Sequence, residues 1–505
     1  MALLGKTRWH GSLALKLAMA ALVVMLGDLV FWQWSQAMGV QGLFGFALVA
    51  ALFAARPAVR QDKRALIALA FAALYAAAQL WDPSPLAFAL FWIAIGTATI
   101  LPGVARFGDG WGWFQRLIVH GFKALVGPLI DLNILGKVRR KRPAGQTGLR
   151  RVIPLIALPL AGGAVFVTLF AQANPVIAEL LARLSLPAFD WELLPRLILC
   201  GLFFVMAWVV LRARPPRRLA ATLDATGDVA LPGFSLGSIT LSLILFNALF
   251  AVQNLMDFAY LSSLIALPPG ITLADYAHRG AYPLVATALL AALFVLVTSR
   301  PGSSTAASPL VRRLVAGWIA QNVVLVLSAA WRTWDYVEAY SLTTLRISAL
   351  LWMGLVAAGL ILVLVRMLQA KSLGWLINAN LASAGLLLTA VCFIDLGAVS
   401  ASWNVRHARE IDGDGAQLDL CYLNELGGSA LLPLIELEGR NLAEPLKGHV
   451  RATRHYLFER LKHQRDDGGW TLLLDTRLAQ ATRLSGSQSQ TPPAGERPCY
   501  GSYDD

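Results

Sequence analysis

Long runs of apolar residues, separated by short polar connections, dominate the first four hundred positions of the chain. An α-helix rises about 1.5 Å per residue, so about 20 apolar residues cross a hydrocarbon layer about 30 Å thick. By this measure we predict eleven transmembrane helices, near residues 17–34, 43–55, 65–80, 86–104, 152–172, 197–211, 235–256, 281–298, 314–330, 347–365 and 374–395. The predicted fold class is therefore all-α, a polytopic bundle of transmembrane helices.

The composition agrees with lipid as the main solvent of the chain. Of its 505 residues, 57% are hydrophobic and only 14% are charged, with a mean hydropathy of +0.60, whereas soluble domains carry roughly 25% charged residues. The net charge of +13 is concentrated between the apolar runs. This distribution excludes nucleic acid as a partner and favours membrane lipids.

The basic residues predict the orientation of the helices in the membrane. Every second connection is rich in lysine and arginine, with 26 such residues in total, whereas the opposite connections carry five. Because basic loops stay on the cytoplasmic side, this bias places the N-terminus in the cytoplasm and residues 397–505 outside. The first run follows a basic segment, exceeds the usual length of a signal peptide and has no small-x-small cleavage site, so we interpret it as a retained signal-anchor.

One basic connection, 105–151, is much longer than the others. Its apolar residues recur at helical spacing, which predicts an amphipathic helix; they are Phe114, Leu117, Ile118, Phe122, Leu125 and Leu129. Such a helix fits the inner headgroup layer, with the basic residues of 137–142 near anionic lipid. The alternative is an ordinary basic loop that obeys the topology rule.

The composition changes after the last apolar run. We predict a membrane domain over 1–396, a small, mainly helical extracytoplasmic domain over 397–485 and a disordered tail over 486–505. Amphipathic helices are expected near 419–426, 442–464 and 470–484. The tail is rich in serine, glycine, glutamine and proline, which is typical of disorder.

Polar residues gather where three consecutive predicted helices end on the outer side. Charged and aromatic side chains at one membrane surface can line a vestibule that binds a lipid headgroup, a sugar or an envelope peptide. They can equally form an interfacial belt, in which Tyr and Trp anchor the helices and Arg–Asp pairs tie their ends together. The candidate ligand-binding residues are Gln253, Asn254, Asp257, Tyr276, Arg279, Arg332, Asp335, Tyr336, Tyr340 and Arg346.

The other chemistry-bearing residues give weaker signals. No nucleotide loop, metalloprotease pair or nucleophile elbow is present, and the histidines of the last 110 positions share no metal-ligand spacing, so no cofactor and no metal are predicted. Cys421 and Cys499 would both lie in an oxidising compartment, where a disulfide between them would tie the tail to the domain.

Several segments resemble a family of bacterial multi-pass membrane proteins. The resemblance is to proteins with domain of unknown function 4173, related to the 4153 group. It implies a location in the bacterial cytoplasmic membrane and supplies no reaction. The segments that carry it are QNLMDFAYL (253–261), 272–284, 336–346, 402–406, 418–426 and 431–434.

Three functional classes remain open at this point. The first is a non-enzymatic protein that binds or senses an envelope component at the outer vestibule, and whose loop 105–151 docks a partner protein. The second is a transporter or flippase of a lipid or small solute. The third is a transferase that uses a lipid-linked donor, with Asp28, Asp257 and Asp335 as candidate catalytic acids.

Overall fold

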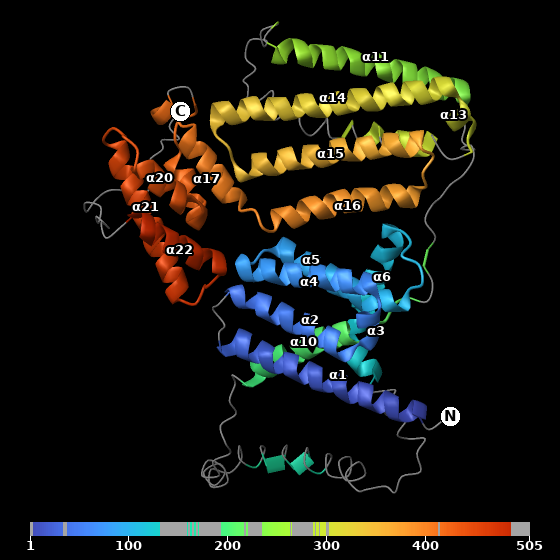
Figure 1. The fold of residues 1–505 in the computed structure, drawn as a ribbon, viewed down its shortest axis with the longest axis vertical. Coiled ribbons are helices and arrows are strands. Elements are labelled where there is room, and N and C mark those ends of the chain that lie inside the picture. The colour runs from blue at the N-terminus through green and yellow to red at the C-terminus, as the bar shows by residue number, and fades with distance from the viewer. Residues whose placement is uncertain are drawn as a thin grey trace.

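The chain is described by a computed structural model over residues 4–33, 38–131, 193–216, 219–220, 235–262, 302–412 and 415–485, with scattered residues in 159–170 and 264–298. Every regular element in these ranges is a helix and none is a strand, which confirms the all-α class. The helices form two bundles and a smaller C-terminal group (Figure 1).

The N-terminal bundle consists of apolar helices that lie side by side in Figure 1. Their helix starts follow local chemistry, because Asp62 and Ser84 each accept a hydrogen bond from a backbone N–H of the first turn. Short α3 (Pro57–Gln61) and amphipathic α6 (Gly110–Leu125) lie at one end. The long members are α1 (Leu4–Asp28), α2 (Gln41–Ala55), α4 (Lys63–Trp81), α5 (Pro85–Ile100) and α10 (Leu193–Leu211).

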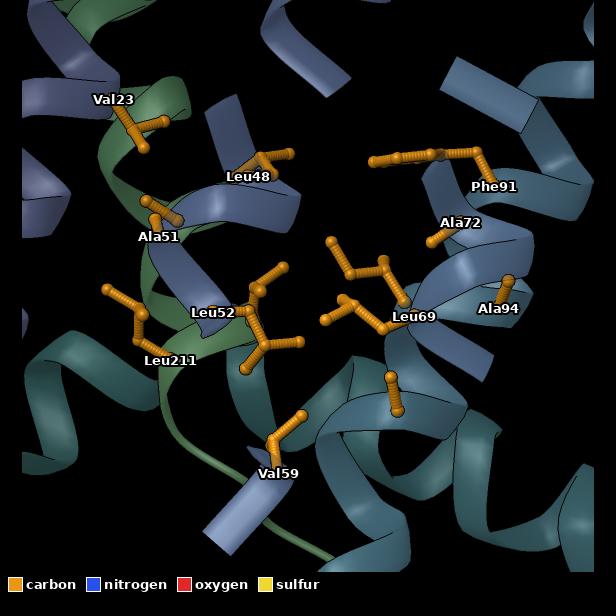
Figure 2. Packing of buried hydrophobic residues seen from close by; sticks show 14 of the residues in the cluster. Val23, Leu48, Ala51, Leu52, Val59, Leu69, Ala72, Phe91, Ala94 and Leu211 are labelled. Atoms are coloured by element: carbon orange, nitrogen blue, oxygen red, sulfur yellow. The ribbon is translucent and has the colours of Figure 1, made fainter. Parts of the chain in front are cut away.

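The core of this bundle is apolar and close-packed. Leu48, Leu52, Leu69 and Leu211 meet between α2, α4 and α10 (Figure 2). A Cβ on Gly42 would lie 2.6 Å from the Ala76 carbonyl oxygen, so α2 and α4 touch through their backbones.

The C-terminal bundle is a row of four long helices. Each is capped by a serine or threonine hydroxyl that accepts a first-turn N–H, which explains where it begins. The last of the four lies against α5 and α6, where its Asn378 accepts a hydrogen bond from the Gly110 N–H at 2.8 Å. The four are α11 (Leu236–Leu261), α14 (Pro309–Tyr340), α15 (Thr344–Leu368) and α16 (Leu373–Val391).

Residues 396–485 form a group of shorter helices with a core of their own, mostly leucines. We call the end of the bundles that carries this group the domain side, and the opposite end the loop side. An ion pair between Arg477 and Asp395 and a 2.8 Å hydrogen bond from Gly39 N–H to the Trp470 carbonyl join the group to the bundles. Its helices are α17 (Leu396–Arg406), α18 (Arg409–Asp412), α19 (Leu420–Glu425), α20 (Leu431–Glu438), α21 (Leu446–Asp466) and α22 (Leu472–Ser485).

Eight helices among the described residues are long and apolar enough to cross a membrane. They run over Leu13–Trp32, Lys63–Trp81, Pro85–Gly103, Leu193–Leu211, Leu236–Leu261, Pro309–Tyr340, Thr344–Leu368 and Leu373–Val391. Two further predicted spans match shorter apolar helices, Gln41–Ala55 and Leu289–Thr298. The predicted span 152–172 lies almost wholly outside the described residues, so the total of eleven stays a prediction.

The predicted bounds err mainly where polar residues follow an apolar run. We expected a span over 314–330, but α14 continues to Tyr340. Backbone hydrogen bonds hold a helix together in any solvent, so its end need not coincide with the end of the apolar run. The helix predicted in 105–151 is present as α6, whereas 132–151 and the tail 486–505 lie outside the described residues.

Candidate functional site

A buried carboxylate joins α11 to α14 near the domain side. Asp257 is 2% exposed and pairs with the guanidinium of Arg332, which is 6% exposed. Its oxygens also accept hydrogen bonds from Gln253 at 2.9 Å and from the Ser328 hydroxyl at 2.9 Å. The carboxylate therefore links two helices in the interior of the protein. The protein's own groups, rather than a ligand, bind its oxygens.

The same pair of helices is joined by amides further towards the loop side. Gln321 of α14 donates to the side-chain oxygen of Asn247 at 3.2 Å, and Asn247 donates to the Leu314 carbonyl at 3.0 Å. Asn254 donates to the Gln321 carbonyl at 3.1 Å. We call these residues, with Asp257 and Arg332, the polar ladder.

The turn between α14 and α15 holds an unusual backbone conformation. Ser341 has φ +69°, a region that a residue with a Cβ rarely adopts. Arg346 stabilises the turn by donating to the Tyr340 carbonyl at 2.6 Å and to the Ser341 carbonyl, while its guanidinium lies 4.1 Å from the centre of the Tyr336 ring. Strained residues of this kind gather at functional sites and persist only where neighbours hold them.

The C-terminal helices hold the next residue of that turn. Asn404 of α17 binds both backbone groups of Leu342, accepting from its N–H at 2.7 Å and donating to its carbonyl at 2.9 Å. The Ser400 hydroxyl donates to the same carbonyl at 2.6 Å, and the Tyr422 hydroxyl accepts from the Thr344 N–H at 3.0 Å. Movement of α17 would therefore displace the turn between α14 and α15 directly.

An open cavity of about 420 Å³ lies at this junction. One wall is the end of α14 with Glu338, and the opposite wall is α17 with Trp403 and His407, whose rings stack with centroids 3.8 Å apart. Glu338 accepts a hydrogen bond from the Trp334 indole at 2.9 Å. The remaining lining residues are Val337, Ser341, Asn404, Gly415 and Ala416.

A charged junction lies nearby on the domain side. Asp395, at the start of α17, accepts from the Ser429 hydroxyl at 2.8 Å and pairs with Arg477 of α22. Burial raises the pKa of Asp82, at the end of α4, and the cation of Arg477 opposes that shift. The two bundles and the C-terminal helices thus meet through charges.

The structure divides the predicted vestibule into separate groups. Gln253, Asp257 and Arg332 contact one another, whereas Asn254 binds the α14 backbone. Tyr336, Tyr340 and Arg346 form the turn cluster, and Asp335 lies between these groups along α14. Tyr276 and Arg279 lie outside the described residues, as does Cys499, so their roles and the disulfide with Cys421 stay predictions.

Sequence reasoning missed the α17 side of the cavity. Trp403 and His407 are four residues apart, which places them on one helical face, but the histidines after the apolar runs were considered only for metal-ligand spacing. Asn404 gave no signal, because its partner Leu342 lies 62 residues earlier. Among the residues that the structure describes, no group of three or more His, Cys, Asp or Glu could hold a metal ion.

These features define a class of protein: a helical membrane protein whose C-terminal helices clamp the turn between two of its spans. A family model described as "Domain of unknown function (DUF4153)" matches residues 14–437, and the chain belongs to that family. The resemblance gave the number 4173 first and 4153 as the related group; the group that matches is 4153. Comparisons with curated proteins and with solved structures gave no match.

The region that the family model matches ends within the C-terminal group of helices. It includes both bundles and continues through α17 and α19 to residue 437, next to the end of α20. The cavity and the clamp on Leu342 lie within it, whereas α21 and α22 lie beyond it. The candidate site is therefore part of the family region.

Proposed function

We propose that this protein binds a small envelope component in the cavity between α14 and α17, and that binding acts on the membrane helices through the clamp on Leu342. The observation that carries the proposal is the cavity itself, built against a strained turn whose neighbours come from both parts of the chain. Its volume of about 420 Å³ is in the range of small-molecule sites.

The lining favours a polar ligand with one flat apolar face, such as a sugar. The stacked rings of Trp403 and His407 offer an apolar surface, and Trp334 packs on Trp403 with centroids 5.2 Å apart. Glu338 offers a hydrogen-bond acceptor beside the rings. Aromatic surfaces with a few placed polar groups are typical of such pockets.

The location follows from the charge pattern. The bias of basic residues supports an outward-facing domain side, and the family resemblance supports the bacterial cytoplasmic membrane. A ligand in the cavity would then come from the cell envelope. A reporter fused after residue 410 tests this orientation: activity of a periplasmic reporter supports it, and activity of a cytosolic reporter alone contradicts it.

Two alternatives have less support from the described contacts. A transferase would need an accessible acid, but Asp28 is bound by Arg196 through two hydrogen bonds of 2.8 and 2.6 Å, and Asp257 is buried in the polar ladder. Of the three candidate acids, Asp335 alone is partly exposed and forms no ion pair among the described residues. A transporter would need polar groups that face a path, whereas the amides of the ladder bind one another or the backbone. Binding is the function that the geometry supports best.

The binding proposal can be tested by saturation-transfer NMR on the purified protein in nanodiscs, with glucose, N-acetylglucosamine and a soluble muropeptide as probes. We expect one of these probes to bind, and Trp403→Ala and Glu338→Gln each to weaken binding at least tenfold. Arg406→Gln is the matched control, because Arg406 is exposed on the same helix and pairs with Glu436 away from the cavity. Equal binding by all four proteins, or none by the wild type at millimolar probe, would contradict the proposal.

A further inference from the structure

A second cavity lies among the membrane helices, towards the other end of α14 from the first site. Its volume is about 450 Å³, and it is lined by α11, Thr287, the short helix 289–298 and α14, with apolar side chains except at Thr287 and the Trp318 indole. Its inner wall is aromatic: Phe246, Phe250 and Phe294 each lie 5.1–5.7 Å from Trp318, centroid to centroid. Its rim carries Leu290 and Leu293, which are 63% and 56% exposed.

The wall contains one polar atom without a partner. Trp318 is 4% exposed, and its indole N–H donates to no acceptor among the described residues. An unpaired donor in an apolar interior is strongly unfavourable in lipid, where no water is present to satisfy it. An occupant that brings an acceptor oxygen to an otherwise apolar cavity would remove this penalty.

The depth of Trp318 indicates where that oxygen comes from. Arg312 and Arg313 are exposed near the start of the same helix, and cations on a transmembrane helix lie at headgroup level. Trp318 is five residues beyond Arg313, about 8 Å deeper along the helix. At that depth below the phosphates a phospholipid carries its ester carbonyls and the start of its acyl chains.

We propose that this cavity binds one phospholipid of the loop-side leaflet, with an acyl chain against the aromatic wall and an ester oxygen accepting from Trp318. The phosphate then lies at the level of Arg312 and Arg313 along α14. The solvent at this face of a membrane helix bundle is lipid, and both the apolar lining and the single unpaired donor match an acyl ester. This site is independent of the cavity between α14 and α17.

The test uses the wild-type protein in nanodiscs that contain a small fraction of phospholipid with a photoreactive diazirine in one acyl chain. After irradiation, mass spectrometry locates the labelled peptides. We expect label to concentrate on residues 241–250 and 286–298, at least fivefold above the exposed apolar face of α16, where Leu386 is 77% exposed. Label spread over all helices in proportion to their exposure would overturn the proposal.

Two variants and a second probe make the test specific. Leu290→Trp fills the cavity, and we expect it to reduce labelling of residues 241–250 at least fivefold. Leu289→Trp is the matched control, since Leu289 is 55% exposed on the same helix and does not line the cavity; equal labelling in both variants would contradict the site. Trp318→Phe keeps the aromatic wall and removes the donor, so it should lower labelling at least twofold.

A photoreactive free fatty acid separates the two possible sources of an acyl chain. It lacks the glycerol ester and the phosphate, so we expect it to label the site at least threefold less than the phospholipid. Labelling as strong as that by the phospholipid would overturn the assignment of the occupant to a phospholipid.

Discussion

The two bundles are both built from apolar helices and are held together by partly different means. In the N-terminal bundle, the buried share of the apolar window is 22% in α1 and α10, 39% in α4 and 44% in α5, and α2 meets α4 at backbone distance through Gly42. In the C-terminal bundle, the corresponding shares are 11% in α11, 17% in α15 and 6% in α16, and only α14 of its described helices reaches 39%. There the polar ladder adds hydrogen bonds and an ion pair to the apolar contacts between α11 and α14.

The difference follows from the solvent. Lipid tails are as apolar as leucine, so burying leucine between transmembrane helices gains little from the hydrophobic effect. Helices in lipid associate through close van der Waals contact between small residues or through hydrogen bonds. Close contact between small residues is prominent in the N-terminal bundle, as Ala51, Ala72 and Ala94 illustrate in Figure 2, although Arg196 and Asp28 also pair between α10 and α1. Hydrogen bonds between side chains are prominent in the C-terminal bundle.

The largest expected effect is on the buried pair of the polar ladder. Arg332→Leu leaves the Asp257 carboxylate without its cation, and Asp257→Leu leaves the guanidinium buried alone; each should reduce the free energy of unfolding by about 3–5 kcal/mol. The double variant removes both charges, so its free energy of unfolding should decrease much less than that of either single variant. Unfolding of the purified proteins in mixed micelles measures all three, and a double variant that loses the sum of the single effects would contradict the idea.

The N-terminal bundle should respond to acid through one buried imidazole. His120 of α6 is 2% exposed, and burial, with Arg56 and Arg214 nearby, lowers its pKa to about 4. Its Nδ1 accepts the Arg214 N–H at 3.1 Å, and its Nε2 is buried. The native ring is therefore neutral at pH 7.

The sign of this pH effect follows from the two states of the chain. An unfolded histidine has a pKa near 6.5, so between pH 6.5 and about 4 the unfolded state binds a proton that the native state does not. Stability should fall by about 3 kcal/mol as the pH decreases through this window. Comparing urea unfolding of the wild type and His120→Gln at pH 7 and pH 4.5 checks this, with His407→Gln as an exposed control; an equal decrease in all three would exclude His120.

A smaller effect tests close packing directly. Gly42→Ala forces a methyl group against the Ala76 backbone and should destabilise the protein by about 1–3 kcal/mol. Gly354→Ala on α15 adds a methyl group where no atom lies within 4 Å, and should stabilise its helix by about 0.5–1 kcal/mol. The two variants should therefore shift the melting temperature in opposite directions, and shifts of the same sign would mean that the bundles do not differ in this way.

The smallest effect concerns a single amide of the polar ladder. Asn247→Leu removes two hydrogen bonds between α11 and α14 and should cost about 1 kcal/mol, since such bonds contribute about 0.6 kcal/mol each on average in membrane proteins. A double-mutant cycle with Gln321→Leu isolates the pair, whose atoms lie 3.2 Å apart. A coupling energy near zero would show that the hydrogen bond between these amides does not stabilise the protein.

Much of the membrane part was predictable because it depends on local properties. The length of an apolar run and the charges beside it belong to one segment, so the sequence predicted the positions of α1, α4, α5, α10, α11, α14, α15 and α16 to within a few residues at most ends. The helix in 105–151 followed from periodicity alone. The polar residues of α11 and α14 also stand out in the sequence, because they lie within or at the ends of apolar runs.

The sequence by itself determined which segments are apolar helices and which of their connections are cationic, since both are properties of neighbouring residues. Only the tertiary structure decided that Asp257 meets Arg332 across 75 positions, that Asn404 holds Leu342 across 62, and that Trp403 and His407 line a cavity with Glu338. These contacts depend on which helices become neighbours. That choice is made by shape and by hydrogen bonding between distant segments, for which local periodicity carries no signal.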